Sequence, residues 1–222
     1  MSEKVSGYAM YSQRDERWRR LILGSSRVTI GDYGCLLCAV ASGVTDLGIR
    51  IHSLVPDPPR LNRWLARNEG FVGSGSDPSN RNRFVFNAMT PLGVEMVDYI
   101  DCRNSPAPLG PLEAALARED QFAVIQVDFK PATGGAQQHW VRPLVWFETD
   151  VEIMDPWIQG PSQQAFLMTH YARSDWDDPR RAIFRIVIYR AAEEGTSYVT
   201  PFQAPVVQAV LCPHPDGVDT DE

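Results

Sequence analysis

The chain has 222 residues, of which 44% are hydrophobic and 22% charged, the balance of a globular protein with one domain and a sizeable core. No apolar run approaches the roughly 18 residues that a membrane-spanning helix needs. The formal charge is −7, but six acidic residues and no Lys or Arg follow Arg190, which leaves 22 acidic against 21 basic residues before the tail. A nearly neutral body excludes the broad basic surface that nucleic-acid binding requires.

The N-terminal region shows no clean periodicity through residues 11–18, so we expect an irregular segment there and a short strand over 27–30. A helix follows. Its apolar residues recur at three- and four-residue steps, which predicts a buried helix from Cys35 to about residue 47: Leu36, Leu37, Val40, Ala41, Val44 and Leu47. Gly48 fits its end.

Cys35 stands at the start of this predicted helix, directly after Gly34. Free backbone N–H groups and the positive end of the helix dipole favour a thiolate there. A small buried side chain is the alternative, since free cysteine is among the most buried residue types. Cys38 completes a C-x-x-C pair, which allows a zinc site or a redox pair. Zinc would need two more ligands at clear spacing, and a redox pair normally follows a strand in a βαβ unit. Neither pattern is present in the sequence.

The central region alternates predicted helices and strands. Prolines precede an amphipathic helix over 60–69, and Gly70 closes it, the usual asymmetry of helix ends. Periodicity and breakers then predict the following elements: a helix over 83–89, a strand over 94–100, a helix over 109–118 and a buried strand over 122–129.

A hairpin is predicted where two apolar strands flank the polar turn at 148–150. His139 begins the first strand and Asp155 ends the second. Their midpoint is residue 147, so the two side chains should lie nearly opposite each other, in contact range. A histidine held by a carboxylate and facing a cysteine at a helix N-terminus is the arrangement of nucleophile, base and orienter.

The C-terminal part predicts a helix over 164–171 and an apolar strand over 182–189. Residues 191–222 are acidic and Pro-rich without periodicity, and we expect a poorly ordered tail after a domain that spans 1–190. His170 and His52 lack the acidic strand motif that accompanies His139, so we do not assign them a catalytic role.

Four motifs in this order resemble the C39-like branch of the papain-fold cysteine peptidases. The segment from Tyr11 to Trp18 is similar to the family's glutamine motif, and Gly34-Cys35 is similar to its nucleophile motif. Residues 138–141 and 154–157 resemble its histidine and aspartate motifs. The resemblance implies an α+β, papain-like fold, with an N-terminal helical portion packed on an antiparallel sheet. A second thiol one turn after the nucleophile, Cys38, departs from the pattern.

The resemblance also implies roles. Cys35 would be the nucleophile, His139 the general base and acid, and Asp155 the residue that orients the imidazole. Gln13 would donate its side-chain amide to the oxyanion, beside the backbone N–H of Cys35. No metal and no organic cofactor is required for such a mechanism.

Three further residues border these motifs and are candidates for substrate contact: Gly34, Trp140 and Trp157. The tryptophans could shield the histidine and aspartate from water, with ordinary packing as the alternative. The expected substrate is a peptide, either a leader peptide or a cell-wall peptide, cleaved at an amide bond.

Two other functions use the same residues. One is a papain-like binding module without catalysis, and the other is a deamidase or acyl transferase with the same triad. Residues 1–6 lack the layout of a signal peptide, and four cysteines are too few for a disulfide framework in a chain of this length. A reducing, cytoplasmic location is therefore the default expectation, with release by lysis or with a phage particle as another route. The sequence predicts no oligomeric state.

Overall fold

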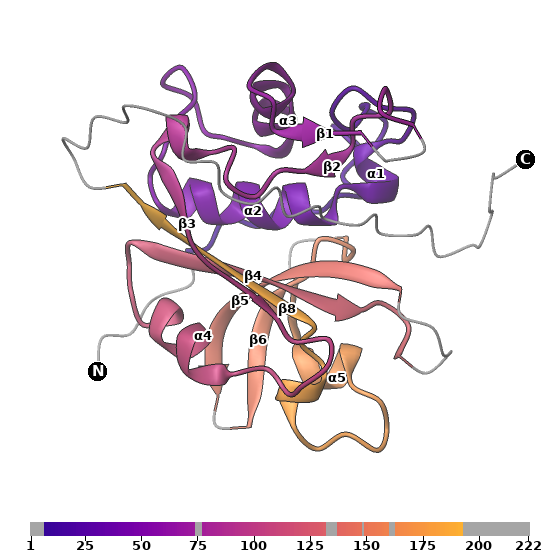
Figure 1. Ribbon diagram of the computed structural model, residues 1–222, viewed down its shortest axis with the longest axis vertical. Coiled ribbons are helices and arrows are strands. Elements are labelled where there is room, and N and C mark those ends of the chain that lie inside the picture. The colour runs from indigo at the N-terminus through magenta and orange to yellow at the C-terminus, as the bar shows by residue number, and fades with distance from the viewer. Residues whose placement is uncertain (1–6, 74–76, 132–136, 148, 160–162, 193–222) are drawn as a thin grey trace, which may run out of the picture.

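The computed structural model describes residues 7–73, 77–131, 137–147, 149–159 and 163–192. A helical portion from the N-terminal part of the chain lies on one face of an antiparallel sheet, as Figure 1 shows. The helices of the described residues are α1 (Ile30–Tyr33), α2 (Cys35–Asp46), α3 (Pro58–Arg67), α4 (Leu109–Leu116) and α5 (Leu167–Tyr171), with 3-10 turns η1 (Thr90–Leu92) and η3 (Pro179–Arg181). This is the mixed α+β architecture that the sequence predicts.

The main sheet has the order β3-β8-β4-β5-β6-β7 within the described residues, and its paired neighbours run antiparallel. Its strands are β3 (Val94–Asp101), β4 (Gln121–Asp128), β5 (Gln138–Phe147), β6 (Asp150–Met154), β7 (Gln164–Phe166) and β8 (Arg185–Ala191). The last strand, β8, therefore inserts between β3 and β4, far from its neighbours in sequence. A small second sheet pairs β1 (Phe71–Val72) with β2 (Arg83–Phe84) in the helical portion.

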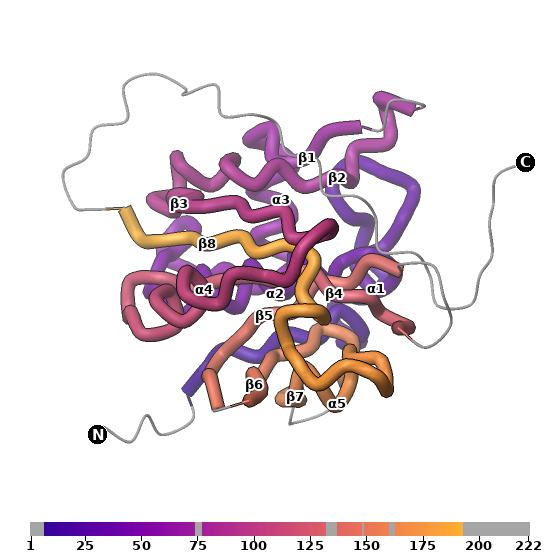
Figure 2. The backbone as a smooth tube through the Cα atoms, turned by 60° about the horizontal axis from the view of Figure 1, so that its bottom comes forward, coloured from indigo at the N-terminus to yellow at the C-terminus, as the bar shows by residue number. Residues whose placement is uncertain are grey.

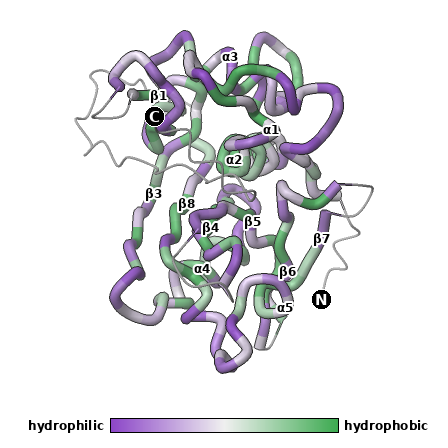
Figure 3. The backbone as a smooth tube through the Cα atoms, turned by 90° about the vertical axis from the view of Figure 1, so that its right-hand side faces the viewer, coloured by the Kyte–Doolittle hydropathy of each residue, from purple (hydrophilic) through white to green (hydrophobic). Residues whose placement is uncertain are grey.

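Two hydrophobic cores lie on the two faces of the main sheet, and strand alternation assigns residues to them. Along β4, Phe122 and Val124 pack toward α2, whereas Ala123, Ile125 and Val127 belong to the core beneath α4 and α5. Figure 3 shows α2 end-on, between α3 and the strands, coloured as a hydrophobic helix. A helix buried on all sides in this way agrees with the apolar run predicted after Cys35.

The helix boundaries follow from local signals. The Asp57 side chain accepts a hydrogen bond from the backbone N–H of Arg60, and prolines occupy the first helical positions, so α3 begins two residues before the predicted range. Gly48, just after α2, has a positive φ of 75° that suits glycine. The tube in Figure 2 shows this helical portion beside the sheet from a second direction.

Three predicted elements are wrong. Residues 27–30 form an isolated bridge, Ile22 to Thr29, and then enter α1, because the Thr29 side chain caps the helix by accepting from the Asp32 backbone N–H. Residues 83–89 form β2 and turns instead of a helix, since Phe71 and Phe84 pair across the small sheet. Residues 164–171 divide into β7 and the short α5, because 164–166 pair with β6.

No helix in the described part of the chain is long and apolar enough to cross a membrane. The predicted tail lies outside the described residues from 193 onward.

Candidate active site

Cys35 opens α2, with Gly34 as the N-cap residue, and its side chain is completely buried. The backbone N–H groups of a helical first turn have no partner within the helix, so this position favours negative charge on sulfur. The helix begins here because Gly34 ends α1, donating its N–H to the Ile30 carbonyl at 2.8 Å, and the chain then starts a new helical direction.

The sulfur of Cys35 is in a disulfide bond, a finding that the sequence analysis did not anticipate. Neither Cys38 nor Cys102 is the partner, because both carry free thiols. Cysteine spacing could not reveal this bond, since pairing depends on which thiols the tertiary structure brings together.

Cys38 lies one turn further along α2 and is fully buried among apolar side chains. Burial raises the pKa of the Cys38 thiol far above its ordinary value, so this sulfur stays protonated and inert. The C-x-x-C pair is not joined by a disulfide, and the described residues contain no group of three or more His, Cys, Asp or Glu that could hold a metal ion.

His139 and Asp155 are in direct contact. Nε2 of His139 lies 2.8 Å from Oδ1 of Asp155, and both side chains are almost completely buried. The other ring nitrogen of His139, Nδ1, is thereby left to face a different partner. This is the geometry of an imidazole held in one orientation by a carboxylate.

The sequence analysis expected these two side chains to lie nearly opposite each other and in contact, and the contact is confirmed. Arg142 of β5 pairs with Met154 of β6, and an irregularity in the register follows between Pro143 and Val145. β6 ends at Met154, so Asp155 lies just past the paired residues, and its side chain reaches His139 from there.

Asp155 remains a carboxylate although it is buried. Burial alone would raise its pKa, but the charge of His139 and hydrogen bonds from His139, Tyr171 and the Trp157 backbone together hold the pKa below its ordinary value. Oδ1 accepts from the Trp157 N–H at 2.9 Å as well as from His139. The carboxylate is thus an acceptor for three donors, the condition under which a buried charge is tolerated.

Gln13 connects the start of the helical portion with the aspartate loop. Its backbone N–H donates to the Pro156 carbonyl at 2.8 Å, and its side-chain Nε2 donates to the Gly31 carbonyl at 2.8 Å. Pro156 directly follows Asp155, and Gly31 lies in the short helix that leads into Cys35. An amide nitrogen carries two donors, so one N–H of this buried side chain is left beyond the bond to Gly31.

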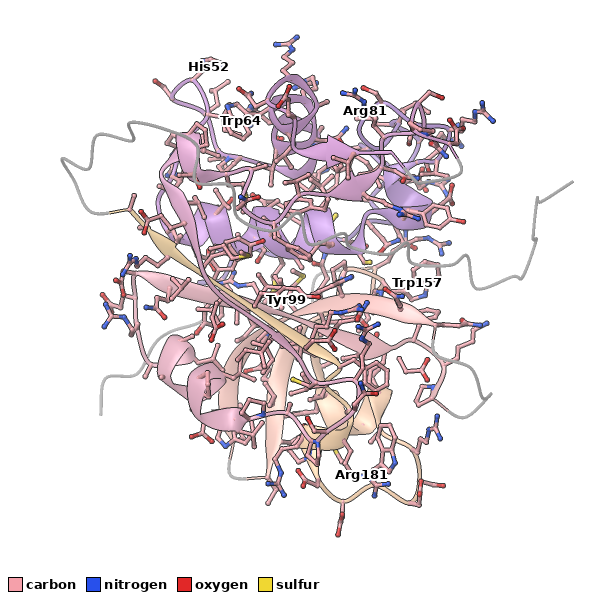
Figure 4. The ribbon with its side chains drawn as sticks, viewed as in Figure 1. His52, Trp64, Arg81, Tyr99, Trp157 and Arg181 are labelled. Carbon is pink, nitrogen blue, oxygen red and sulfur yellow. The ribbon has the colours of Figure 1, made fainter. Side chains whose placement is uncertain are left out.

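Aromatic rings cover the imidazole. Phe129 lies edge-on to His139 and to Trp157, with ring centroids 5.1 Å apart in both cases. The guanidinium of Arg14 lies 4.4 Å from the centre of the Trp157 ring. Figure 4 shows Trp157 at the end of the molecule where α1 leads into α2, between the helices and the sheet.

The two other predicted substrate contacts have structural explanations. Trp140 is 1% exposed and packs against Phe86 in the core beneath α2, so it provides packing instead of a surface for substrate. A Cβ on Gly34 would lie 2.4 Å from the Ile30 carbonyl oxygen, so a close backbone approach accounts for glycine at this position.

Sequence reasoning missed two residues of the site, Phe129 and Tyr171. Phe129 directly follows β4, and the pairing of Val127 with His139 between β4 and β5 places it on the imidazole. Tyr171 ends α5, and its hydroxyl reaches Asp155. No local motif marks either residue, because each contact joins segments that are distant in sequence or cross a turn. His170 and His52 are both exposed and take no part in the site.

Comparison with known proteins gives one distant structural match. No family model and no curated protein matches the chain. One solved structure, described as a "putative C39-like peptidase" from Bacillus anthracis, matches 72% of this chain and 90% of its own length, with 17% sequence identity and a TM-score of 0.44. This is a distant structural neighbour, and it establishes neither an activity nor a substrate for this chain.

Proposed function

We propose that this protein is a papain-like cysteine peptidase that cleaves an amide bond in a peptide. The observation that carries the proposal is the buried His139–Asp155 pair, joined through Gln13 to the segment that begins the Cys35 helix. A nucleophile at a helix N-terminus, an imidazole oriented by a carboxylate and an amide donor are the parts that thiol-dependent amide hydrolysis needs.

The proposed reaction starts from the reduced enzyme, in which an external dithiol has released the Cys35 sulfur by thiol–disulfide exchange and has itself been oxidised to a disulfide. His139 takes the thiol proton, and the thiolate attacks the carbonyl carbon. The free N–H of the Gln13 amide and the backbone N–H of Cys35 stabilise the oxyanion, each donor contributing about 3–4 kcal/mol in comparable sites. His139 protonates the leaving amine, and water then hydrolyses the thioester to release the acid and regenerate the thiol.

The surroundings of His139 support this role. Phe129 and Trp157 pack against the site and limit water around the imidazole, which strengthens its interaction with Asp155. Asp155 keeps its negative charge and steadies the imidazolium that forms during the reaction.

A non-catalytic papain-like module is the second candidate, and two observations favour it. Cys35 is oxidised and completely buried, as a structural disulfide would be. Strand alternation also turns His139 toward Tyr171 of α5, since its neighbour Trp140 packs on the α2 side of the sheet.

The deciding experiment is the pH dependence of Cys35 alkylation by iodoacetamide in the reduced protein, followed by mass spectrometry of the Cys35 peptide. A peptidase shows rapid labelling near pH 6 that is lost in His139→Ala and retained in Cys38→Ser. The unreduced protein is the control and should not label at Cys35. Labelling no faster than that of an ordinary thiol, and unchanged in His139→Ala, would establish the binding module instead. Peptides and cell-wall peptides are then the first substrates to test.

A further inference from the structure

Tyr171 is a buried phenol that reaches the site from α5. Its hydroxyl donates to Oδ2 of Asp155 at 2.5 Å, while His139 and the Trp157 backbone N–H occupy Oδ1. The backbone N–H of Asp155 donates to the Gln163 carbonyl at 2.9 Å. The carboxylate is therefore fixed on both oxygens and at its backbone.

The Tyr171 contact is specific to Oδ2. The Asp155 side chain is 2% exposed and that of Tyr171 is buried in the core beneath α5, so water does not substitute readily for the phenol. Burial and the negative charge of Asp155 raise the pKa of the Tyr171 hydroxyl well above its ordinary value. The phenol consequently stays a protonated donor throughout the range in which a peptidase works.

We propose that Tyr171 is a positioning residue of the site, which holds Oδ1 of Asp155 on His139 and sets the pH at which His139 accepts a proton. The proposal rests on the proposed peptidase function for its role in catalysis. Rotation of the carboxylate would move Oδ1 off Nε2, and a hydrogen bond to Oδ2 prevents that rotation. The same bond disperses the carboxylate charge that faces the imidazole.

The direction of the effect follows from the charges. His139 and Tyr171 are the side chains that act on Asp155, from β5 and from α5. With His139 neutral, the pair carries a net negative charge, and the phenol stabilises this state most. Protonation of His139 neutralises the pair overall. Loss of the phenol therefore favours protonation, and the titration midpoint of His139 moves to higher pH.

The test is the His139 titration midpoint in Tyr171→Phe, followed by NMR of the imidazole C–H signals in the full chain, which has four histidines. A hydrogen bond to a charged group is worth about one pKa unit or somewhat more, so we expect an upward shift of about one pH unit. The acid limb of Cys35 alkylation should move by the same amount in the reduced protein.

Tyr189→Phe is the matched control. Tyr189 is completely buried, and among the described residues its hydroxyl has no hydrogen-bond partner, so this variant loses the same atom without touching Asp155. Its His139 midpoint should equal that of the wild type. A folded Tyr171→Phe protein with an unmoved midpoint would overturn the proposal.

A second measurement covers the case in which Tyr171→Phe does not fold. Site-specific 3-fluorotyrosine at position 171 keeps the hydroxyl but makes it a stronger donor, and the His139 midpoint should then move to lower pH. An unchanged midpoint in this folded protein also overturns the proposal. The NMR titration does not depend on thiol reactivity, so ordinary alkylation of Cys35 together with a shifted His139 midpoint would reject the peptidase and leave the positioning contact established.

Discussion

Two buried ion pairs lie three residues apart on β5. One joins His139 to Asp155 near the start of the strand, and the other joins Arg142 to Asp46 at the last turn of α2, with Arg142 NH1 2.5 Å from Oδ2 of Asp46. Both basic side chains are about 5% exposed or less. The two basic side chains are thus similarly buried, whereas the Asp46 side chain is 20% exposed and that of Asp155 only 2%.

The Arg142–Asp46 pair joins α2 to strand β5 of the main sheet. Arg142 also donates to the Ser42 hydroxyl at 2.7 Å, and its guanidinium lies over the rings of Tyr8 and Phe122. Burial lowers the pKa of Arg142, which the charge of Asp46 opposes, yet a guanidinium stays charged at any pH the protein meets. A cation near a helix C-terminus is also favourable to the helix dipole. The Arg142–Asp46 pair therefore stabilises the packing of α2 on the sheet and does not take part in proton transfer.

The His139–Asp155 pair differs because its bond leaves one ring nitrogen of the imidazole, Nδ1, outside the contact with the carboxylate. An imidazole changes its charge near neutral pH, and the bond to Asp155 engages Nε2 alone. Aromatic rings limit water around it. A buried basic side chain is thus common to both pairs. Only the His139–Asp155 pair can exchange a proton, so it can serve chemistry, whereas the Arg142–Asp46 pair is structural. Three predictions test this distinction.

The largest effect is expected for Asp46→Ala. Removing one partner of a buried pair leaves the other charge uncompensated, and such losses cost about 3–5 kcal/mol of the free energy of unfolding. Denaturant unfolding measures the change, and alkylation of reduced Cys35 in the protein that remains folded should proceed at the wild-type rate.

The control for this variant is Asp120→Ala, which breaks the exposed pair with Arg118. Exposed pairs contribute roughly 0–1 kcal/mol, so its unfolding free energy should remain close to that of the wild type. Equal losses of unfolding free energy in the two variants, or slow Cys35 alkylation in Asp46→Ala, would contradict a purely structural role for the Arg142–Asp46 pair.

Asp155 should show the reverse behaviour, with the larger effect on reactivity. In Asp155→Ala the imidazole loses both its acceptor and the charge that steadies its protonated form, and we expect Cys35 alkylation near pH 6 to slow about a hundredfold. Asp155→Asn retains an acceptor and loses only the charge, so an intermediate rate, about tenfold slower, is expected. Wild-type rates in both variants would show that the pair has no influence on the thiol.

The smallest effect concerns acid stability. The pKa of Asp155 is lower in the folded protein than its ordinary value near 3.9, so its contribution to stability is complete above that value and is lost as the pH falls through it toward the folded pKa. The free energy of unfolding of the wild type should therefore decline more steeply between pH 5 and pH 3 than that of Asp155→Asn. Parallel declines would contradict the depressed pKa.

The sequence predicted correctly those elements that depend on nearby residues, and failed where an element depends on contacts with distant segments. The helix after Cys35, the helix near residues 60–69 and the hairpin containing His139 were all predicted, because periodicity and breakers record which side chains are buried. The helix predicted over 83–89 failed because Phe84 pairs with Phe71 in another segment. Trp140 was assigned to substrate because it follows His139, whereas alternation along β5 sends it into the opposite core.

Sequence patterns alone predict the α+β character of this protein, the placement of Cys35 at a helix start and the candidacy of His139, Asp155 and Gln13 as one group. These follow from periodicity, from helix-end chemistry and from the resemblance of the ordered motifs. The hydrogen bond of Tyr171 to Oδ2 of Asp155, the disulfide state of Cys35 and the burial of Trp140 emerge only from the fold. Strand register and the packing of α5 depend on contacts between distant segments, which no local pattern encodes.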